Sequence, residues 1–223
     1  LTGDRRFVDS WTRMIDIVNS NARTIDGVKQ YPYMYGDDGW YDFRREPVSW
    51  GTLESWFWTM DEKDKTRVSN NPWIRFLNRD DPDYPERTLR HEFETIRKKV
   101  VGMRADTTTK DTRLADDPMK FNPATVGALN QLMMAGLDPG RGGGPLHCRL
   151  RYFDPINRRA GIPQDVAALV GSISDKNVSV TLVNISQSET RELIVQAGAY
   201  GEHRVTQVHD GRNNVTVDSS TFR

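Results

Sequence analysis

The sequence predicts an α+β protein: an α-helical N-terminal part followed by an antiparallel, β-sandwich-like C-terminal part. Apolar residues recur every three or four positions through the first 137 residues, which is typical of amphipathic helices. Beyond residue 146 they recur at every second position, which is typical of strands. The glycine-rich residues 138–145 separate the two periodicities. We therefore expect domains at 1–137 and 146–223, linked by a joint at 138–145.

The N-terminal part is expected to hold several short helices and one long one. The apolar residues of Phe7–Val18 have helical spacing, and Ser49 fits the N-cap of a second helix. Asparagine followed by proline, at Asn71 and at Asn122, predicts the start of a short helix at each place. The longest helix is predicted at about 86–104, where five apolar residues are spaced alternately four and three apart.

The C-terminal part reads as a series of short strands. Alternating segments near 146–153, 178–185, 205–208 and 215–217 are separated by turn-forming residues, and 193–195 is expected to be the return strand after 178–185. Such spacing indicates an antiparallel sandwich. The last strand pattern breaks off at the C-terminus, and the N-terminus carries neither Met nor a signal peptide. We therefore expect a piece of a longer polypeptide, with the sandwich truncated.

The composition excludes several classes of protein. The 223 residues carry 31 basic and 31 acidic side chains, so the chain lacks the positive charge of a nucleic-acid binder. No apolar run reaches the roughly 18 residues of a membrane helix, so we expect no membrane partner. The single Cys148 rules out an intrachain disulfide but does not distinguish a cytoplasmic from a secreted protein. No metal or cofactor motif is present, so neither is predicted.

The most informative segment is a ring-rich stretch expected to form a long loop at residues 31–47. Its aromatic side chains surround two adjacent acids, Asp37 and Asp38. Glycosidic bond cleavage needs two carboxyl groups: Asp37 or Asp38 could be one, and Glu46 or Glu54 the other. Asp37, Asp38 and Glu54 are thus the predicted catalytic residues. The alternative is a packed loop in which both aspartates make turn hydrogen bonds.

Aromatic rings near these acids are predicted to stack on sugar faces. Trp50, Glu54 and Trp58 are expected to share one helical face, where the indoles would desolvate the carboxyl between them. The alternative is a helix docked by its tryptophans, with Glu54 at the edge. The predicted substrate-binding residues are Tyr35, Trp40, Tyr41, Trp50 and Trp58.

Several segments resemble bacterial proteins built from an α-helical toroid followed by a C-terminal β-sandwich. The resemblance covers most of the chain and rests on Gly36–Tyr41, Met103–Thr109, Phe121–Thr125, Leu150–Asp154 and Val180–Asn184. It implies that residues 1–137 are the end of an α/α toroid. This layout is common among glycoside hydrolases and polysaccharide lyases, although fold analogy does not by itself give function.

Three functional hypotheses follow. The first is part of a carbohydrate-active enzyme, hydrolase or lyase, whose partner is a carbohydrate substrate held in an aromatic-lined groove. The second is a non-catalytic module that binds a glycan or a partner chain. The third is a structural fragment that associates with itself or with a missing part of the same polypeptide.

Overall fold

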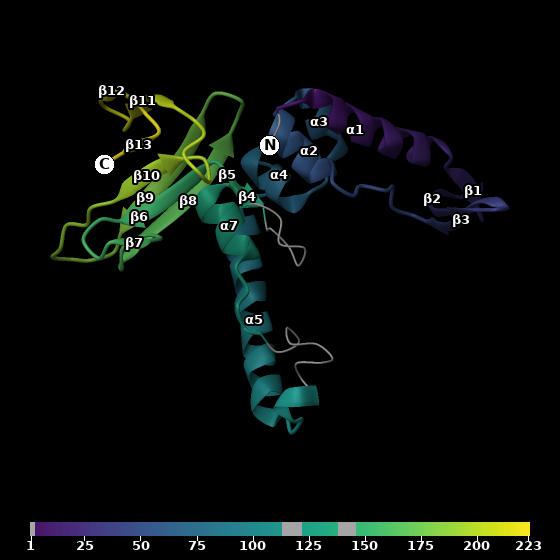
Figure 1. Ribbon diagram of the computed structural model, residues 1–223, viewed down its shortest axis with the longest axis horizontal. Helices are drawn as coiled ribbons and strands as arrows, with labels where there is room; N and C mark the ends of the chain where they lie inside the picture. Colours follow the sequence, from purple (N-terminus) through teal and green to yellow (C-terminus); the bar gives the residue numbers. More distant parts are fainter. Residues whose placement is uncertain (1–2, 113–121, 138–145) are drawn as a thin grey trace. The chain divides into compact units, whose positions relative to one another are not determined.

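The computed structural model describes residues 3–112, 122–137 and 146–223, and it confirms an α+β protein with antiparallel sheets (Figure 1). The chain divides into two compact units, Leu1–Ile74 and Arg75–Arg223, with the boundary inside a short helix. The predicted joint at 138–145 lies outside the described residues. Each unit is described by itself below.

The first unit begins with α1 (Arg5–Ser20), which is capped by Asp4: its carboxylate accepts a hydrogen bond from the backbone N–H of Arg6. One stripe of the helix, formed by Val8, Thr12 and Ile15, is buried. A neighbouring stripe that includes Phe7 leaves its apolar side chains exposed. The helix therefore packs through only part of its hydrophobic surface.

The predicted aromatic loop is wrong: this segment belongs to a three-stranded antiparallel sheet. Its strands are β1 (Arg23–Ile25), β2 (Val28–Gly36) and β3 (Gly39–Arg44), in that order. Asp26 and Gly27 join the first two strands, and both have positive φ (51° and 74°), as a type I′ turn requires. Asp37 and Asp38 join the second pair, followed by Gly39 at φ 93°. These turns place strands within the part predicted to be helical.

Two short helices and the first residues of a third complete the first unit and contribute much of its core. They are α2 (Thr52–Thr59), α3 (Glu62–Arg67) and α4 (Pro72–Leu77). Trp56, Phe57 and Trp73 are buried and meet with ring centroids 6.3 Å apart. Asn71 caps α4 as predicted, since its side chain accepts a hydrogen bond from the Trp73 N–H. Ser49 is not the N-cap of α2, because Gly51, at φ 68°, occupies that position.

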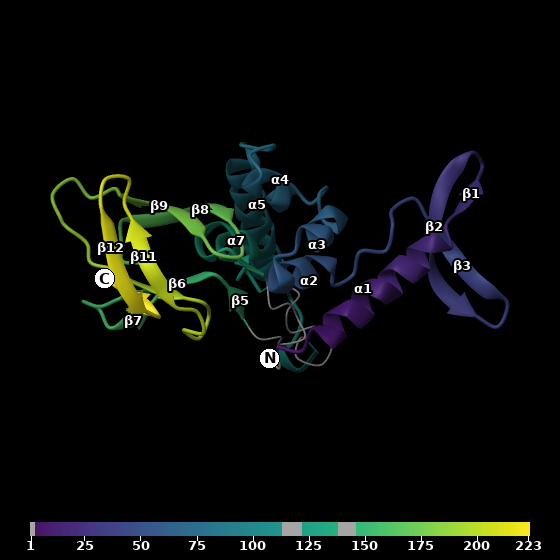
Figure 2. The same ribbon diagram turned by 90° about the horizontal axis from the view of Figure 1, so that it is seen from above.

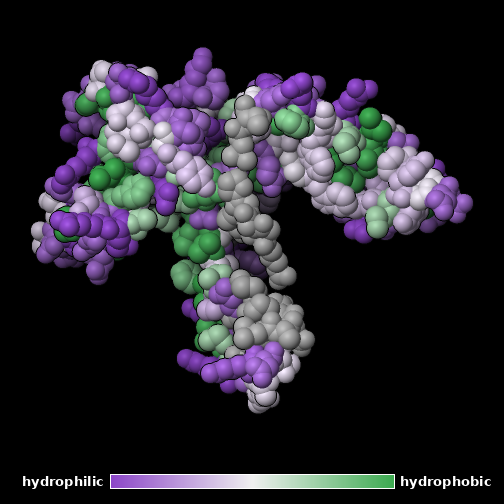
Figure 3. Space-filling model, viewed as in Figure 1, coloured by the Kyte–Doolittle hydropathy of each residue, from purple (hydrophilic) through white to green (hydrophobic). Residues whose placement is uncertain are grey.

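The second unit contains the long predicted helix, α5 (Tyr84–Ala105), and the shorter α7 (Gly127–Met134). The predicted start of α7 at Asn122 is wrong, because the helix begins five residues later. Tyr84 donates a hydrogen bond to Gln131, which links the two helices. No residue of α5 is buried, and Figure 3 shows hydrophobic residues reaching the surface along it. Phe93, for example, is 59% exposed.

The remaining strands are all antiparallel, as predicted. A four-stranded sheet has the order β13-β10-β6-β7, and the pairs β4-β5, β8-β9 and β11-β12 form separate sheets. The predicted return strand pairs elsewhere: β10 lies beside β6, whereas β9 pairs with β8. The strands are β4 (Gly136–Leu137), β5 (His147–Cys148), β6 (Leu150–Asp154), β7 (Arg159–Ala160), β8 (Val166–Ile173), β9 (Val178–Asn184), β10 (Ile194–Ala197), β11 (Val205–His209), β12 (Asn214–Ser219) and β13 (Thr221–Phe222).

Candidate functional site

The β2–β3 hairpin sorts its aromatic residues onto two faces. Side chains alternate along a strand, so Tyr31, Tyr33 and Tyr35 of β2 share one face. Trp40 lies directly opposite Tyr35 in the register and therefore joins them. Tyr41 lies opposite Met34 and belongs to the other face. The structure thus brings together Tyr35 and Trp40 among the predicted binding residues, and it separates Tyr41 from them.

Ring contacts extend this row beyond the sheet. Tyr35 and Trp40 meet edge to face, with centroids 4.8 Å apart and planes at 70°. Tyr33 meets Trp50 at 5.6 Å and 84°. Both are favourable aromatic geometries. We call Tyr31, Tyr33, Tyr35, Trp40 and Trp50 the aromatic face; Tyr35 is 70% exposed and Trp50 58%.

Two cations stack on the tyrosines of the aromatic face. The guanidinium carbon of Arg44 lies 4.4 Å from the ring centroid of Tyr33, and Nζ of Lys29 lies 5.3 Å from that of Tyr31. These are cation–π distances. Arg44 is also paired with the carboxylate of Asp42 at 2.6 Å. The two stacked tyrosines are therefore supported from within the sheet, whereas Tyr35 and Trp50 present the most surface to solvent.

Trp50 is positioned by α1 rather than by α2. It precedes α2, so the expected helical face shared by Trp50, Glu54 and Trp58 does not form. The indole N–H of Trp11 donates to the Trp50 carbonyl at 2.9 Å. The side-chain amide of Asn19 bonds both backbone groups of Val48, donating to the carbonyl at 2.9 Å and accepting from the N–H at 2.8 Å. The segment that carries Trp50 is thereby fastened to the helix.

Close packing explains the glycine that follows Trp50. A Cβ atom on Gly51 would lie 2.6 Å from the indole nitrogen of Trp11, and the residue has φ 68°. Both observations favour glycine here. Trp11, Asn19 and Gly51 were not predicted as site residues. The spacing of Trp11 marks it only as a helix residue, and nothing near Asn19 in the sequence signals its contact with Val48.

The three predicted catalytic acids are not brought together. Asp37 and Asp38 are exposed at the turn between β2 and β3, and Glu54 is exposed on α2. Figures 1 and 2 both place this hairpin beyond the C-terminal end of α1, away from α2. Glu54 is therefore not desolvated between two indoles. Paired-carboxylate catalysis places two carboxyl groups on either side of one bond, and Glu54 on α2 does not face the turn of Asp37 and Asp38 in this way.

Trp58 lies in a different part of the first unit. It lines a surface depression of about 360 Å³ together with Gly3, Arg5, Val8 and Thr59. The guanidinium of Arg5 lies 3.6 Å from the carboxylate of Asp61. Trp58 is 43% exposed, but no ring contact in the described residues joins it to the aromatic face. The predicted binding residues therefore divide among three surfaces.

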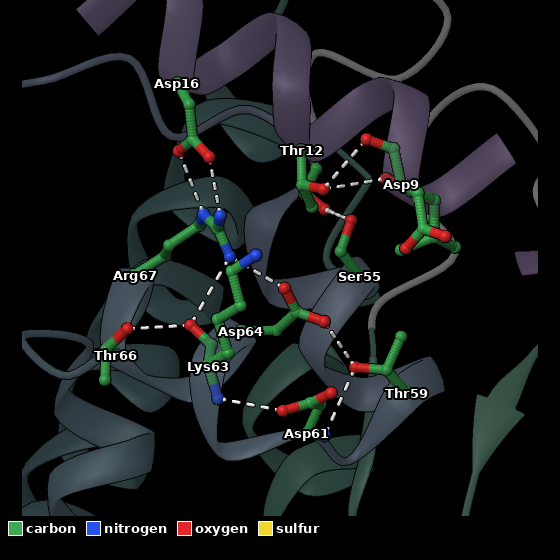
Figure 4. A network of polar contacts seen from close by, with 12 residues as sticks. Asp9, Thr12, Asp16, Ser55, Thr59, Asp61, Lys63, Asp64, Thr66 and Arg67 are labelled. Atoms are coloured by element: carbon green, nitrogen blue, oxygen red, sulfur yellow. Dashed lines mark hydrogen bonds and ion pairs between the residues drawn. The ribbon is translucent and has the colours of Figure 1, made fainter. Parts of the chain in front are cut away.

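A polar network joins α1 to α3. Figure 4 shows the guanidinium of Arg67 between two carboxylates. It donates to Asp16 at 3.2 and 2.7 Å and to Asp64 at 2.7 Å. The hydroxyl of Thr59 donates to the other oxygen of Asp64, which is 6% exposed. The hydrogen bonds from Arg67 lower the pKa of Asp16. Every member has a partner, so we assign the network to stability.

Residues 3–112, 122–137 and 146–223 contain neither a metal cluster nor a membrane-spanning helix. No group of three or more His, Cys, Asp or Glu side chains in these ranges is placed to hold a metal ion. No helix there is both long and apolar enough to cross a bilayer. The single cysteine, Cys148, is buried, and burial raises its pKa to about 11.

Comparison with known proteins gives one match. Residues 68–130 match the model of a domain of unknown function, DUF8034. The match spans α4 and α5 and ends within α7, so it does not include the aromatic face. No curated protein and no solved structure matches the chain.

Proposed function

We propose that this chain is a non-catalytic glycan-binding module and that the aromatic face is its binding surface. A single observation carries the proposal: five rings are gathered on and beside one face of a small sheet, and Tyr35 and Trp50 are each more than half exposed. Sugars present flat apolar faces on which such rings stack. Exposed aromatic surface of this kind is characteristic of a binding site.

The charges around the rings favour a neutral glycan. Arg44 is balanced by Asp42, and both cations on this face are stacked on tyrosines. The hydroxyl groups of a sugar can be bonded by Asp37 and Asp38 at the adjacent turn, since carboxylates accept such protons. In this proposal the two aspartates bind ligand and perform no acid–base chemistry. The α/α-toroid and β-sandwich architecture implied by the resemblance remains a hypothesis.

The test is retention of the whole chain on a panel of neutral polysaccharides, followed by titration with the oligosaccharide of the polymer that retains it. We expect Tyr35→Ala and Trp50→Ala each to weaken binding by about tenfold, which corresponds to roughly 1.4 kcal/mol. Trp58→Ala is the matched control and should bind as the wild type does. Trp58 is also an exposed tryptophan of the first unit, but it lies off the aromatic face.

Two results would contradict the proposal. One is that the chain is retained by no polymer in the panel. The other is that the Trp58 variant loses as much affinity as the Trp50 variant. A third result would instead support an enzyme. In that case the wild-type chain releases reducing ends from a polymer, and Asp37→Asn, Asp38→Asn or Glu54→Gln abolishes this release.

A further inference from the structure

The second unit contains a long edge strand that lacks the usual protection against pairing. In the described part of the chain, β9 pairs only with β8, so its other edge presents free backbone N–H and carbonyl groups. Native edge strands are commonly blocked by charged side chains, proline, a bulge or short length. The seven residues of β9, Val178–Asn184, include neither a charge nor a proline.

Other edges of the second unit do show such protection. The outer strands of the four-stranded sheet, β7 and β13, are two residues long. The β11–β12 hairpin carries Asp218 at φ 55° and an irregular register near Val205. The irregularity in the β8–β9 hairpin falls at Val170 and Ser172 of β8, which leaves β9 itself regular. Within the described residues, β9 is therefore the edge best suited to receive another strand.

We propose that β9 is a self-association surface, on which β9 of a second copy of this chain pairs antiparallel to give a four-stranded β8-β9-β9-β8 sheet. A two-fold axis at Thr181 aligns all seven residues, and any shift of the axis shortens the overlap. Thr181 then faces its own copy, Val180 faces Leu182, and Ser179 faces Val183. A two-fold axis of this kind closes the assembly at a dimer on this edge.

The side chains are self-complementary in this register. Threonine opposite threonine is favourable across antiparallel strands, and Val180 opposite Leu182 is an apolar pair. No charge of β9 meets another, because the strand has none. The nearest charged residue, Lys176, would face Ser186 of the second copy, and Asp175 would face Gln187. Leu182 and Val183 are 45% and 46% exposed on opposite faces of the strand, so pairing covers apolar surface on both.

Cysteine cross-linking tests both the surface and the register. In a Cys148→Ala background, Thr181→Cys places two thiols directly opposite each other. Directly opposed Cα atoms are about 4.5–5.5 Å apart, within the range that a disulfide spans. Ser179→Cys is the matched control on the same face of the same strand. Its two copies would be four residues out of register, about 13 Å apart.

We expect mild oxidation to give a covalent dimer from the Thr181 variant and little from the Ser179 variant. Equal cross-linking of the two variants would overturn the proposed register. Sedimentation measurements on the unmodified chain, from micromolar concentration upward, should show a monomer–dimer equilibrium. A chain that stays monomeric to its solubility limit, or that grows into open-ended oligomers, would overturn the proposal.

A charge at the two-fold axis provides the second variant. Thr181→Lys places two ammonium groups directly opposite each other in the dimer, and like charges in such positions are destabilising. We expect the dimer dissociation constant to rise at least tenfold. Thr216→Lys, on the exposed strand β12, controls for the added charge and should dimerise as the wild type does. Far-UV circular dichroism establishes that both variants are folded. A Thr181→Lys variant that is folded and still dimeric would refute the proposal.

Discussion

Asn19 fastens the segment before Trp50 to α1, and its removal should destabilise the first unit measurably. Asn19→Ala leaves the N–H and carbonyl of the buried Val48 without their partner. Two such bonds contribute about 2–3 kcal/mol together. The substitution also stabilises the helix by about 0.6 kcal/mol, because alanine has a higher helix propensity than asparagine. The expected net loss is therefore about 2 kcal/mol in the free energy of unfolding.

The assay is urea unfolding followed by tryptophan fluorescence. All six tryptophans lie within Leu1–Ile74, so this signal reports on the first unit alone. With a slope of about 1 kcal/mol per molar urea for a unit of this size, the midpoint should fall by about 2 M. Asn21→Ala is the control, because Asn21 makes a single exposed side-chain bond to the Ile17 carbonyl. An unchanged midpoint, or an equal fall in the control, would refute the assigned role.

Three further predictions follow from other contacts. Arg67 lowers the pKa of Asp16. The stability gained from this pair is therefore present above the ordinary aspartate pKa of about 4 and is lost as the pH falls through the lowered pKa. Arg67→Ala should flatten the acid limb of a pH titration of unfolding monitored by fluorescence. Gly198→Ala should lower the melting temperature more than Gly201→Ala: both glycines have positive φ, but only at Gly198 would a Cβ lie 2.4 Å from a glutamate carboxylate. Because the pKa of Cys148 is about 11, a thiol reagent at pH 8 should label it only after unfolding.

The helices and strands of the chain were predictable where a regular pattern was long. The α5 pattern of five apolar residues gave the helix to within two residues at either end. The hairpin at 28–44 was missed because its aromatic residues occupy both faces of β2 and β3, which hides the alternation of a strand. Asp26-Gly27, a strong signal for a type I′ turn, was the available evidence.

The candidate site was predictable in its residue types but not in its arrangement. The density of rings drew attention to residues 31–50, and the register of β2 and β3 then decides which rings share a face. That register depends on two turns, and a shift of one residue would exchange the faces. The support of Trp50 by Trp11 and Asn19 joins residues about 30–40 positions apart, which no local pattern reveals.

The exposure of α5 affects how readily this helix unfolds locally within the second unit. A helix of 22 residues with none buried is stabilised mainly by its own backbone hydrogen bonds and by one side that contacts α7. Most of the stability of helices in proteins comes from packing of an amphipathic face rather than from helix propensity, and α5 buries none of its residues. Its amides should therefore exchange with solvent deuterium much faster than those of β6 and β10, whose residues include the buried Tyr152 and Val195. Helix α5, which lies within the matched residues 68–130, should thus be less protected from exchange than the central strands of its unit.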